Sequence, residues 1–151
     1  MSSTGLEVFD RTLQATNEWL KLMMRELGTD NRRHAFNALR AALHAVRDRI
    51  GPDNAIHLGA QLPMLLRGAY YEGWRPTRTP TRERRLEEFL DHVAFDLPYE
   101  DNMAPSEAAR ATFAVLTRCL DPGEAQKLFW LLPGEARYLW PREAVHASPN
   151  Q

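Results

Sequence analysis

The segment from Arg67 to Trp74 carries the side chains of this sequence that are best suited to binding. On a helix, Arg67 shares a face with Tyr70 and Tyr71, which lie three and four residues further on. A guanidinium group can bind a carboxylate or a phosphate through two hydrogen bonds. Tyrosine, tryptophan and arginine also dominate the energetics of protein–protein contacts. The segment is therefore a candidate binding surface or pocket wall.

A structural role for the same segment is also open. Tyr70 can fill a core, Arg67 can tie two helices together, and Gly68 can let helices approach closely. An internal repeat bears on this alternative, because a shift of 70 residues lays the chain over itself without a gap.

Under this shift, Arg67 meets Arg137 and Tyr70 meets Trp140. Similar residues at matched positions indicate a shared structural role in a duplicated unit. We therefore assign Arg67 and Tyr70 mainly to the fold. Three residues of the segment have unlike counterparts and keep the functional interpretation: Tyr71, Glu72 and Trp74.

A cluster of arginines follows in the linker and the next predicted helix: Arg75, Arg78, Arg82, Arg84 and Arg85. Beside aromatic residues, such a cluster can bind an anionic partner or nucleic acid through salt-dependent contacts. The alternative is a solvated linker face, because Glu87, Glu88 and Asp91 lie about one turn further on and can offset the charge. The candidate binding residues are Arg67, Tyr70, Tyr71, Glu72, Trp74, Arg75 and Arg78.

Other chemistries lack a complete set of residues. The single Cys119 excludes an internal disulfide. No Gly-rich phosphate loop, nucleophile elbow or zinc-ligand spacing is present. Glu143 and His146 form the only Glu-x-x-His pair of the sequence, whereas a di-iron bundle needs two such pairs and two further glutamates. We therefore expect no metal, no cofactor and no catalytic residues.

The bulk composition is that of an ordinary globular protein, with 44% hydrophobic and 26% charged residues. A net charge of −1 argues against a nucleic-acid binder that relies on a large positive field. The N-terminus lacks the pattern of a secretory signal, and no run of about 18 apolar residues could cross a bilayer. A bacterial-type cytoplasmic protein is the expectation.

The spacing of apolar residues predicts helices and no strands. In the first half it predicts a long helix over 6–27 and a second helix capped by Asp30. Pro52 opens a short third helix, Pro63 ends it, and a fourth helix runs over 64–71.

The second half repeats this order after a linker at 75–80 that is rich in proline and threonine. Its helices are expected over 81–97, 105–120, 122–131 and 134–139. A unit of about 70 residues is marginal alone. We therefore predict an all-α fold in which two four-helix units, 1–74 and 81–141, share one core, followed by a loose tail at 142–151.

The run from Leu62 to Trp74 resembles a motif, LPxxLRGxYYEGW, of the bacterial family DUF2267. Three later segments are similar to the second half of that family's pattern: Gly123-Glu124-Ala125, Leu131-Leu132-Pro133 and Leu139-Trp140-Pro141. The resemblance implies an all-helical bacterial domain, and it brings no activity, substrate or catalytic residues to this chain.

Two functions from different classes are compatible with these observations. The first is a binding or adaptor module whose surface from Tyr71 to Arg85 engages a protein partner or a second copy of the chain. The second is a small-ligand-binding protein or enzyme with a pocket between the halves, using Arg67, Tyr70, Tyr71 and His44.

We favour the binding module, because the sequence supplies interface residues but no complete catalytic set. An exposed aromatic patch at Tyr71 and Trp74 would support it, whereas a deep pocket lined by Arg67 and His44 would favour the second function. We expect neither a nucleic acid nor a membrane as the partner.

Overall fold

The computed structural model describes residues 3–142, in which all regular secondary structure is helical. This confirms the predicted all-α class. The first half contains α1 (Glu7–Leu27), α2 (Arg32–Arg49), α3 (Pro52–Ala60) and α4 (Met64–Tyr71). A 3₁₀ helix, η1 (Pro76–Arg78), lies in the connection between the halves. The second half contains α5 (Leu86–Phe95), α6 (Pro105–Cys119), α7 (Pro122–Leu131) and two further 3₁₀ helices, η2 (Tyr99–Asp101) and η3 (Gly134–Leu139).

The ends of the first helices follow from local chemistry. Gly28 ends α1 in a left-handed conformation with φ 69°, which glycine adopts without steric cost. The side chain of Asn31 caps α2 by accepting a hydrogen bond from the backbone N–H of His34. The prediction that Asp30 is this cap was therefore wrong by one residue. Pro52 begins α3 as expected, since proline loses no useful N–H at that position.

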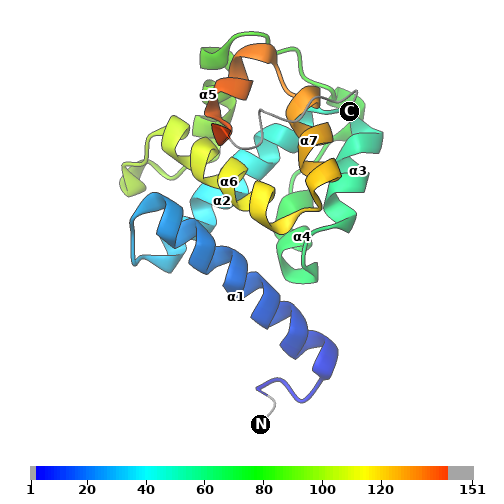
Figure 1. The fold of residues 1–151 in the computed structure, drawn as a ribbon, viewed down its shortest axis with the longest axis vertical. Helices are drawn as coiled ribbons and strands as arrows, with labels where there is room; N and C mark the ends of the chain where they lie inside the picture. The colour runs from blue at the N-terminus through cyan, green and yellow to red at the C-terminus, as the bar shows by residue number, and fades with distance from the viewer. Residues whose placement is uncertain (1–2, 143–151) are drawn as a thin grey trace.

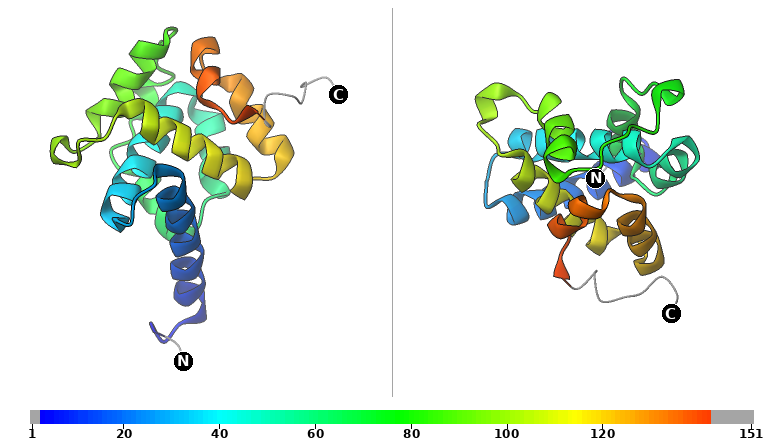
Figure 2. Two further views of the ribbon diagram at one scale, coloured as in Figure 1. Left: turned by 60° about the vertical axis from the view of Figure 1, so that its left-hand side comes forward. Right: turned by 90° about the horizontal axis from the view of Figure 1, so that it is seen from above.

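The helices α2 and α6 cross at the centre of the molecule, and the other elements pack around them (Figure 1). The helix α1 packs against α2, α4 and α6, while its N-terminal end projects beyond the rest of the molecule (Figure 2). Buried side chains from both halves form one apolar cluster, with Tyr70, Phe89 and Phe113 among its largest members. One core therefore runs through both halves.

The packing between elements has a regularity that matches the sequence shift. Every well-packed pair of elements among the described residues has a counterpart 70 residues along the chain. Thus α1–α2 corresponds to α5–α6, α2–α3 to α6–α7, and α1–α6 to α5–α2, while α2–α6 corresponds to itself. A two-fold relation between the halves would produce this pattern. We keep the tandem repeat of two units, 1–74 and 81–141, as our interpretation of it.

The connection between the halves is longer than the predicted linker at 75–80. The first helix of the second half begins at Leu86 and not at residue 81. The backbone N–H of Thr81 donates instead to the carbonyl of Asp48 at the end of α2, at 2.8 Å. The Glu88 carboxylate accepts from the N–H of Arg85, which fixes the start of α5 there.

Two further expectations concern the C-terminal end. The last element of the second half, Gly134–Leu139, is a 3₁₀ helix where the first half has the α-helix α4. Most of the predicted tail at 142–151 lies outside the described residues. Within residues 3–142, no helix combines the length and apolar character needed to span a membrane.

Candidate functional site

Arg67 closes the end of a helix. Its Nε donates to the carbonyl of Gly59 at 2.8 Å, near the C-terminal end of α3. Arg137 makes the corresponding bond from its Nε to the carbonyl of Phe129 at 3.1 Å, in α7. Both guanidinium groups thus satisfy helix carbonyls that lack intrahelical partners. The structure therefore places Arg67 in a fold-supporting contact rather than in an open pocket.

Tyr70 is fully buried, and its hydroxyl donates to the carbonyl of Ala55 at 2.7 Å. Burial raises the pKa of this hydroxyl far above its ordinary value, with the neighbouring Tyr71 contributing, so Tyr70 stays neutral. Its counterpart Trp140 is also buried and stacks on Phe113, with ring centroids 4.7 Å apart. Tyr70 and Trp140, which lie 70 positions apart, are therefore both core residues.

Tyr71 and Trp74 lie together but do not form an exposed patch. Their ring centroids are 5.4 Å apart, and both side chains are half-buried against the core. The Tyr71 ring lies over Gly59 of α3, where a side chain would collide with it. The aromatic patch that would have supported a partner site here is therefore missing from the described surface.

We predict that Gly59→Ala lowers the free energy of unfolding by about 1–3 kcal/mol, because overpacking costs energy of this order. The added Cβ would stand 2.7 Å from Cζ of Tyr71 and 3.1 Å from Cε2 of the buried Tyr70. Urea unfolding of the two variants measures the difference. Gly68→Ala is the control, since nothing lies within 4 Å of its added Cβ. A loss of equal size in a Tyr71→Ala background would contradict the proposed collision.

The remaining candidate residues of the segment are exposed. Glu72 accepts from Nε of Arg40 at 3.3 Å through its carboxylate, and its backbone carbonyl accepts from Arg47 at 2.8 Å. Arg75 and Arg78 are exposed in the connection after α4. Neither makes a side-chain hydrogen bond or an ion pair with another described residue.

A charged network that the sequence did not reveal lies beside this connection. Arg47 is only 4% exposed, and its guanidinium donates to the carbonyls of Tyr70 and Glu72 and to the carboxylate of Asp48. His92 from α5 contacts the same carboxylate at 3.2 Å through Nε2. It thereby links α5 in the second half to α2 in the first.

The other ring nitrogen of His92, Nδ1, lies 2.6 Å from the carboxylate of Glu83. Hydrogen bonds to Asp48 and to Glu83 raise the pKa of His92 to about 9, against the opposing effect of burial. Burial alone would raise the pKa of each carboxylate. The hydrogen bond from His92, joined at Asp48 by one from Arg47, outweighs burial and holds both pKa values below their ordinary range.

These three titratable side chains do not make a metal site. The two carboxylates bind opposite nitrogens of one imidazole, so their oxygens do not converge on a common point. Within residues 3–142, no group of three or more His, Cys, Asp or Glu side chains could hold a metal ion.

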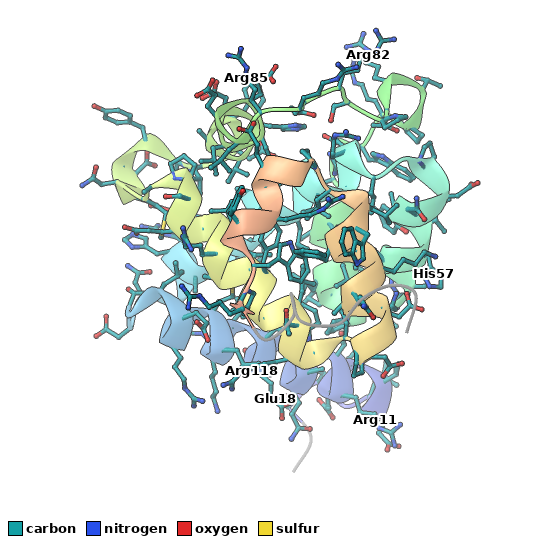
Figure 3. All side chains as sticks on the ribbon, turned by 45° about the horizontal axis from the view of Figure 1, so that its top comes forward. Arg11, Glu18, His57, Arg82, Arg85 and Arg118 are labelled. Carbon is teal, nitrogen blue, oxygen red and sulfur yellow. The ribbon has the colours of Figure 1, made fainter. Side chains whose placement is uncertain are left out.

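A basic, polar pocket of about 660 Å³ lies on the connection between α4 and α5. Arginines and threonines dominate its lining: Arg49, Thr77, Arg78, Thr79, Pro80, Thr81, Arg82 and Arg84. Arg82 and the nearby Arg85 point outward at this end of the molecule (Figure 3). Among the lining arginines, Arg49 donates to the carbonyl of Glu83 at 3.0 Å. The carboxylate of Glu83 faces His92 and so does not neutralise the pocket.

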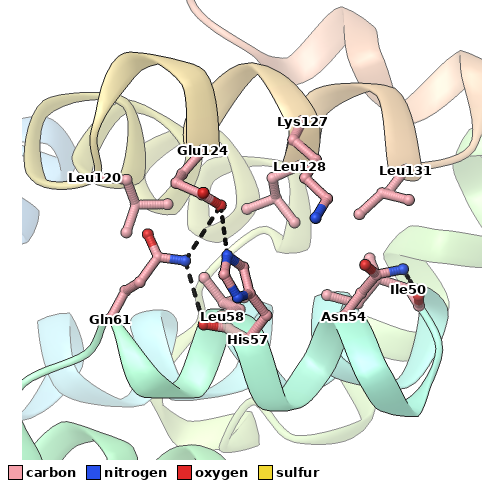
Figure 4. A pocket seen from close by; sticks show the side chains of 10 residues that line it. All are labelled: Ile50, Asn54, His57, Leu58, Gln61, Leu120, Glu124, Lys127, Leu128 and Leu131. Carbon is pink, nitrogen blue, oxygen red and sulfur yellow. Dashed lines mark hydrogen bonds and ion pairs between the residues drawn. The ribbon is translucent and has the colours of Figure 1, made fainter.

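A second pocket lies between the halves, where α3 faces α7 (Figure 4). Its ten lining residues form five pairs that are each 70 positions apart: Ile50/Leu120, Asn54/Glu124, His57/Lys127, Leu58/Leu128 and Gln61/Leu131. Nε2 of His57 lies 2.9 Å from the carboxylate of Glu124, and this contact links α3 to α7 across the pocket. The cavity of about 20 Å³ has room for roughly one water molecule, so it is too small for a substrate.

Comparison with known protein families gives one match. The family described as "Uncharacterized conserved protein (DUF2267)" matches residues 16–139, which is more than half of the chain. The chain belongs to the DUF2267 family. No curated protein matches the sequence.

The DUF2267 match begins within α1 and leaves out its projecting N-terminal part. This part exposes the apolar side chains of Leu6, Phe9 and Leu13, and Met64 and Leu65 at the start of α4 are exposed as well. Apart from Ile56 on α3, the large exposed apolar residues of the first half therefore lie at the start of α1 and of α4, outside the segment 71–85 where the sequence suggested an aromatic surface.

Proposed function

We propose that this DUF2267 protein is a binding module whose arginine-lined pocket takes an acidic segment of a protein partner. The observation that carries the proposal is the pocket itself, which Arg78, Arg82 and Arg84 line together with three threonines. Their guanidinium groups make no side-chain hydrogen bond or ion pair with another described residue. They are thus available to carboxylates from outside.

The chemistry of this surface favours carboxylates over neutral groups. Each guanidinium can bind one carboxylate through two parallel hydrogen bonds, which are stronger than hydrogen bonds between neutral groups. A single exposed pair contributes only about 0.2–1 kcal/mol, so a useful affinity requires several arginines acting on one partner segment. Arg75 and Arg85 flank the pocket along the chain and extend the basic surface, although Arg85 also contacts Glu87 at 3.2 Å.

The proposal changes the part of the Tyr71–Arg85 surface that is expected to bind. The aromatic residues Tyr71 and Trp74 pack on the core, so the basic part of the surface remains for the partner. The cavity between α3 and α7 gives the alternative, a small-ligand-binding protein or enzyme, no support at that place. We retain a cytoplasmic location as part of the proposal, with which the lone Cys119 is compatible.

We predict that replacing Arg78, Arg82 and Arg84 together with glutamine weakens partner capture at least tenfold. The change removes the bidentate donors and leaves the helices intact, since all three residues lie outside α-helices. Wild type and variant are immobilised, lysate of the native host is passed over both, and the retained proteins are quantified by mass spectrometry. The complex should also weaken steeply with added salt, because exposed charge contacts are screened.

The control variant replaces Arg11, Arg25 and Arg33 with glutamine. These residues are exposed on α1 and α2, away from the pocket. Both variants have a net charge of −1 − 3 = −4, so a difference between them reports position and not total charge. Equal capture by all three proteins would refute the proposed surface. Capture that disappears after nuclease treatment would replace the protein partner with a nucleic acid.

A further inference from the structure

The first half contains a buried histidine whose two ring nitrogens both have acceptors as partners. Nδ1 of His44 lies 2.8 Å from the carboxylate of Asp96, and Nε2 lies 2.8 Å from the carbonyl of Ala69. The side chain is 3% exposed. The imidazole therefore fills the space between α2, the end of α4 and the end of α5 and satisfies acceptors on two sides.

The same place in the second half keeps the acceptors and lacks the imidazole. Under the shift of 70 positions, His44 corresponds to Ala114 and Ala69 corresponds to Leu139. Asp96 of the second half corresponds to Glu26 of the first. Ala114, Leu139 and Glu26 line one pocket of about 370 Å³. The Glu26 side chain, on α1, carries a carboxylate as Asp96 does. Among the described residues, no side chain donates a hydrogen bond to the carbonyl of Leu139.

A second large side chain of the first half also has a smaller counterpart in this pocket. In the first half, the guanidinium of Arg47 occupies the space beside His44 and donates to the carbonyl of Tyr70. Its counterpart Thr117 is much shorter, and its hydroxyl donates to the carbonyl of Phe113, within its own helix α6. Two basic side chains of the first half are thus replaced by small residues at the matched positions. The pocket lies at the place where these smaller side chains stand.

The rim of the pocket carries positive charge. Arg110 and Arg118 lie four residues before and after Ala114, about 6 Å in each direction along α6, and share its helical face. Neither makes an ion pair or a side-chain hydrogen bond with another described residue. The wall includes Trp140, whose buried indole N–H has no hydrogen-bond partner. The pocket therefore offers an acceptor side, with Glu26 and Leu139, and donors for an anion.

We propose that this pocket binds a free basic amino acid of the histidine type. Its imidazole takes the place that His44 fills in the first half and donates to the Glu26 carboxylate and the Leu139 carbonyl. Its carboxylate then lies over Ala114, within reach of Arg110 or Arg118. Such charge-assisted hydrogen bonds are the strong ones available to a small polar ligand, and a pocket of this volume is of the size that holds small molecules.

This site is independent of the proposed partner surface. It lies among α1, α6 and η3, whereas the arginine-lined pocket lies on the connection between α4 and α5. Loss of one activity would leave the other intact. The two inferences can therefore fail separately.

Isothermal titration calorimetry of the full chain with L-histidine tests the proposal, at about pH 6 where the free imidazole carries a proton. We expect one bound molecule per chain. Glu26→Gln should weaken binding about tenfold or more, and Ala114→His should abolish it, because the new side chain fills the space as His44 does. Glu107→Gln on α6 is the control, since Glu107 is exposed and outside the pocket. Imidazole, which lacks the carboxylate, should bind at least tenfold more weakly than L-histidine.

Each of these measurements can overturn the proposal. Absence of heat with L-histidine at millimolar concentration would show that the wild-type pocket takes no such ligand. Binding that survives in Ala114→His, with the variant folded by circular dichroism, would place the ligand elsewhere. An equal affinity for imidazole and L-histidine would remove the role given to Arg110 and Arg118.

Discussion

Arg47→Ala is expected to lower the free energy of unfolding by about 3–5 kcal/mol, the usual cost of removing one partner of a buried ion pair. The guanidinium satisfies the carbonyls of Tyr70 and Glu72 near the end of α4 and pairs with the carboxylate of Asp48. Its loss leaves two acceptors without donors and a partly buried carboxylate with one cation fewer. Urea denaturation followed by circular dichroism measures the change.

Arg40→Ala serves as the control for this variant. Arg40 lies on the same helix and is partly exposed, and among the described residues its side chain bonds only to the exposed carboxylate of Glu72, at 3.3 Å. We expect it to cost less than about 1 kcal/mol. A similar small loss in Arg47→Ala would mean that water replaces the guanidinium without penalty. The interpretation of Arg47 as the anchor of α4 would then be wrong.

The second large effect is a dependence of stability on pH that comes from His92. Its pKa is about 9 in the folded chain, against about 6.5 for an unperturbed histidine. A group whose pKa is raised by folding contributes its full stability below the unfolded pKa. The contribution is lost as the pH rises through the folded pKa. We therefore expect the protein to lose up to about 3 kcal/mol of stability between pH 6 and pH 9.5.

The carboxylates partnered with His92 set the other limit. The pKa values of Asp48 and Glu83 are lowered by folding, so their contribution is present above about pH 4 and is lost as the pH falls below it. Stability should therefore be highest at mildly acidic pH. Thermal unfolding at a series of pH values tests both limits together.

His92→Gln should remove most of the loss between pH 6 and pH 9.5. The matched control is His57→Gln, because His57 also pairs with a carboxylate across the two halves but is half exposed. It should leave the wild-type profile nearly unchanged. A profile in His92→Gln as steep as that of the wild type would assign the pH dependence to other groups.

Much of the helical framework could be predicted from the sequence, because apolar spacing and proline positions determine where helices begin and end. The bounds of α4 and α7 agree with prediction. The helix was predicted to start at residue 81, because the local pattern does not report the bond from Thr81 to Asp48, which lies far away in the sequence. The cap between Glu88 and Arg85 then sets the start of α5. Local patterns carry no information on such contacts.

Some contacts of the candidate site could likewise be predicted from the sequence, and others could not. The repeat led us to assign Arg67 and Tyr70 to the fold, and Arg67 and its counterpart Arg137 make similar contacts to helix carbonyls. Tyr70 and Trp140 are both buried, although, within the described part of the chain, only Tyr70 has a hydrogen-bond partner for its polar atom. The repeat did not indicate that Tyr71 packs over Gly59. That contact joins two helices of one half, and no spacing rule reports it.

The network of Arg47, Asp48, Glu83 and His92 was also missed. His92 lies 44 residues from Asp48 and is presented by a different helix, so the sequence offers no motif for it. One usable signal was present for the pocket in the second half. A comparison of matched positions shows His44 opposite Ala114 and Arg47 opposite Thr117, which marks a loss of volume at one place.

The paired lining of the cavity between α3 and α7 has a consequence for how such a molecule can evolve. Ten residues in five matched pairs are what two identical chains would present to each other around a symmetry axis. In an assembly of identical chains, every substitution occurs twice. A single chain with two corresponding halves is free of that restriction. On our interpretation of the chain as a tandem repeat, one half can keep the buried His44 while the matched position of the other half holds Ala114. A pocket can then form in one half without loss of the packing that His44 provides in the other.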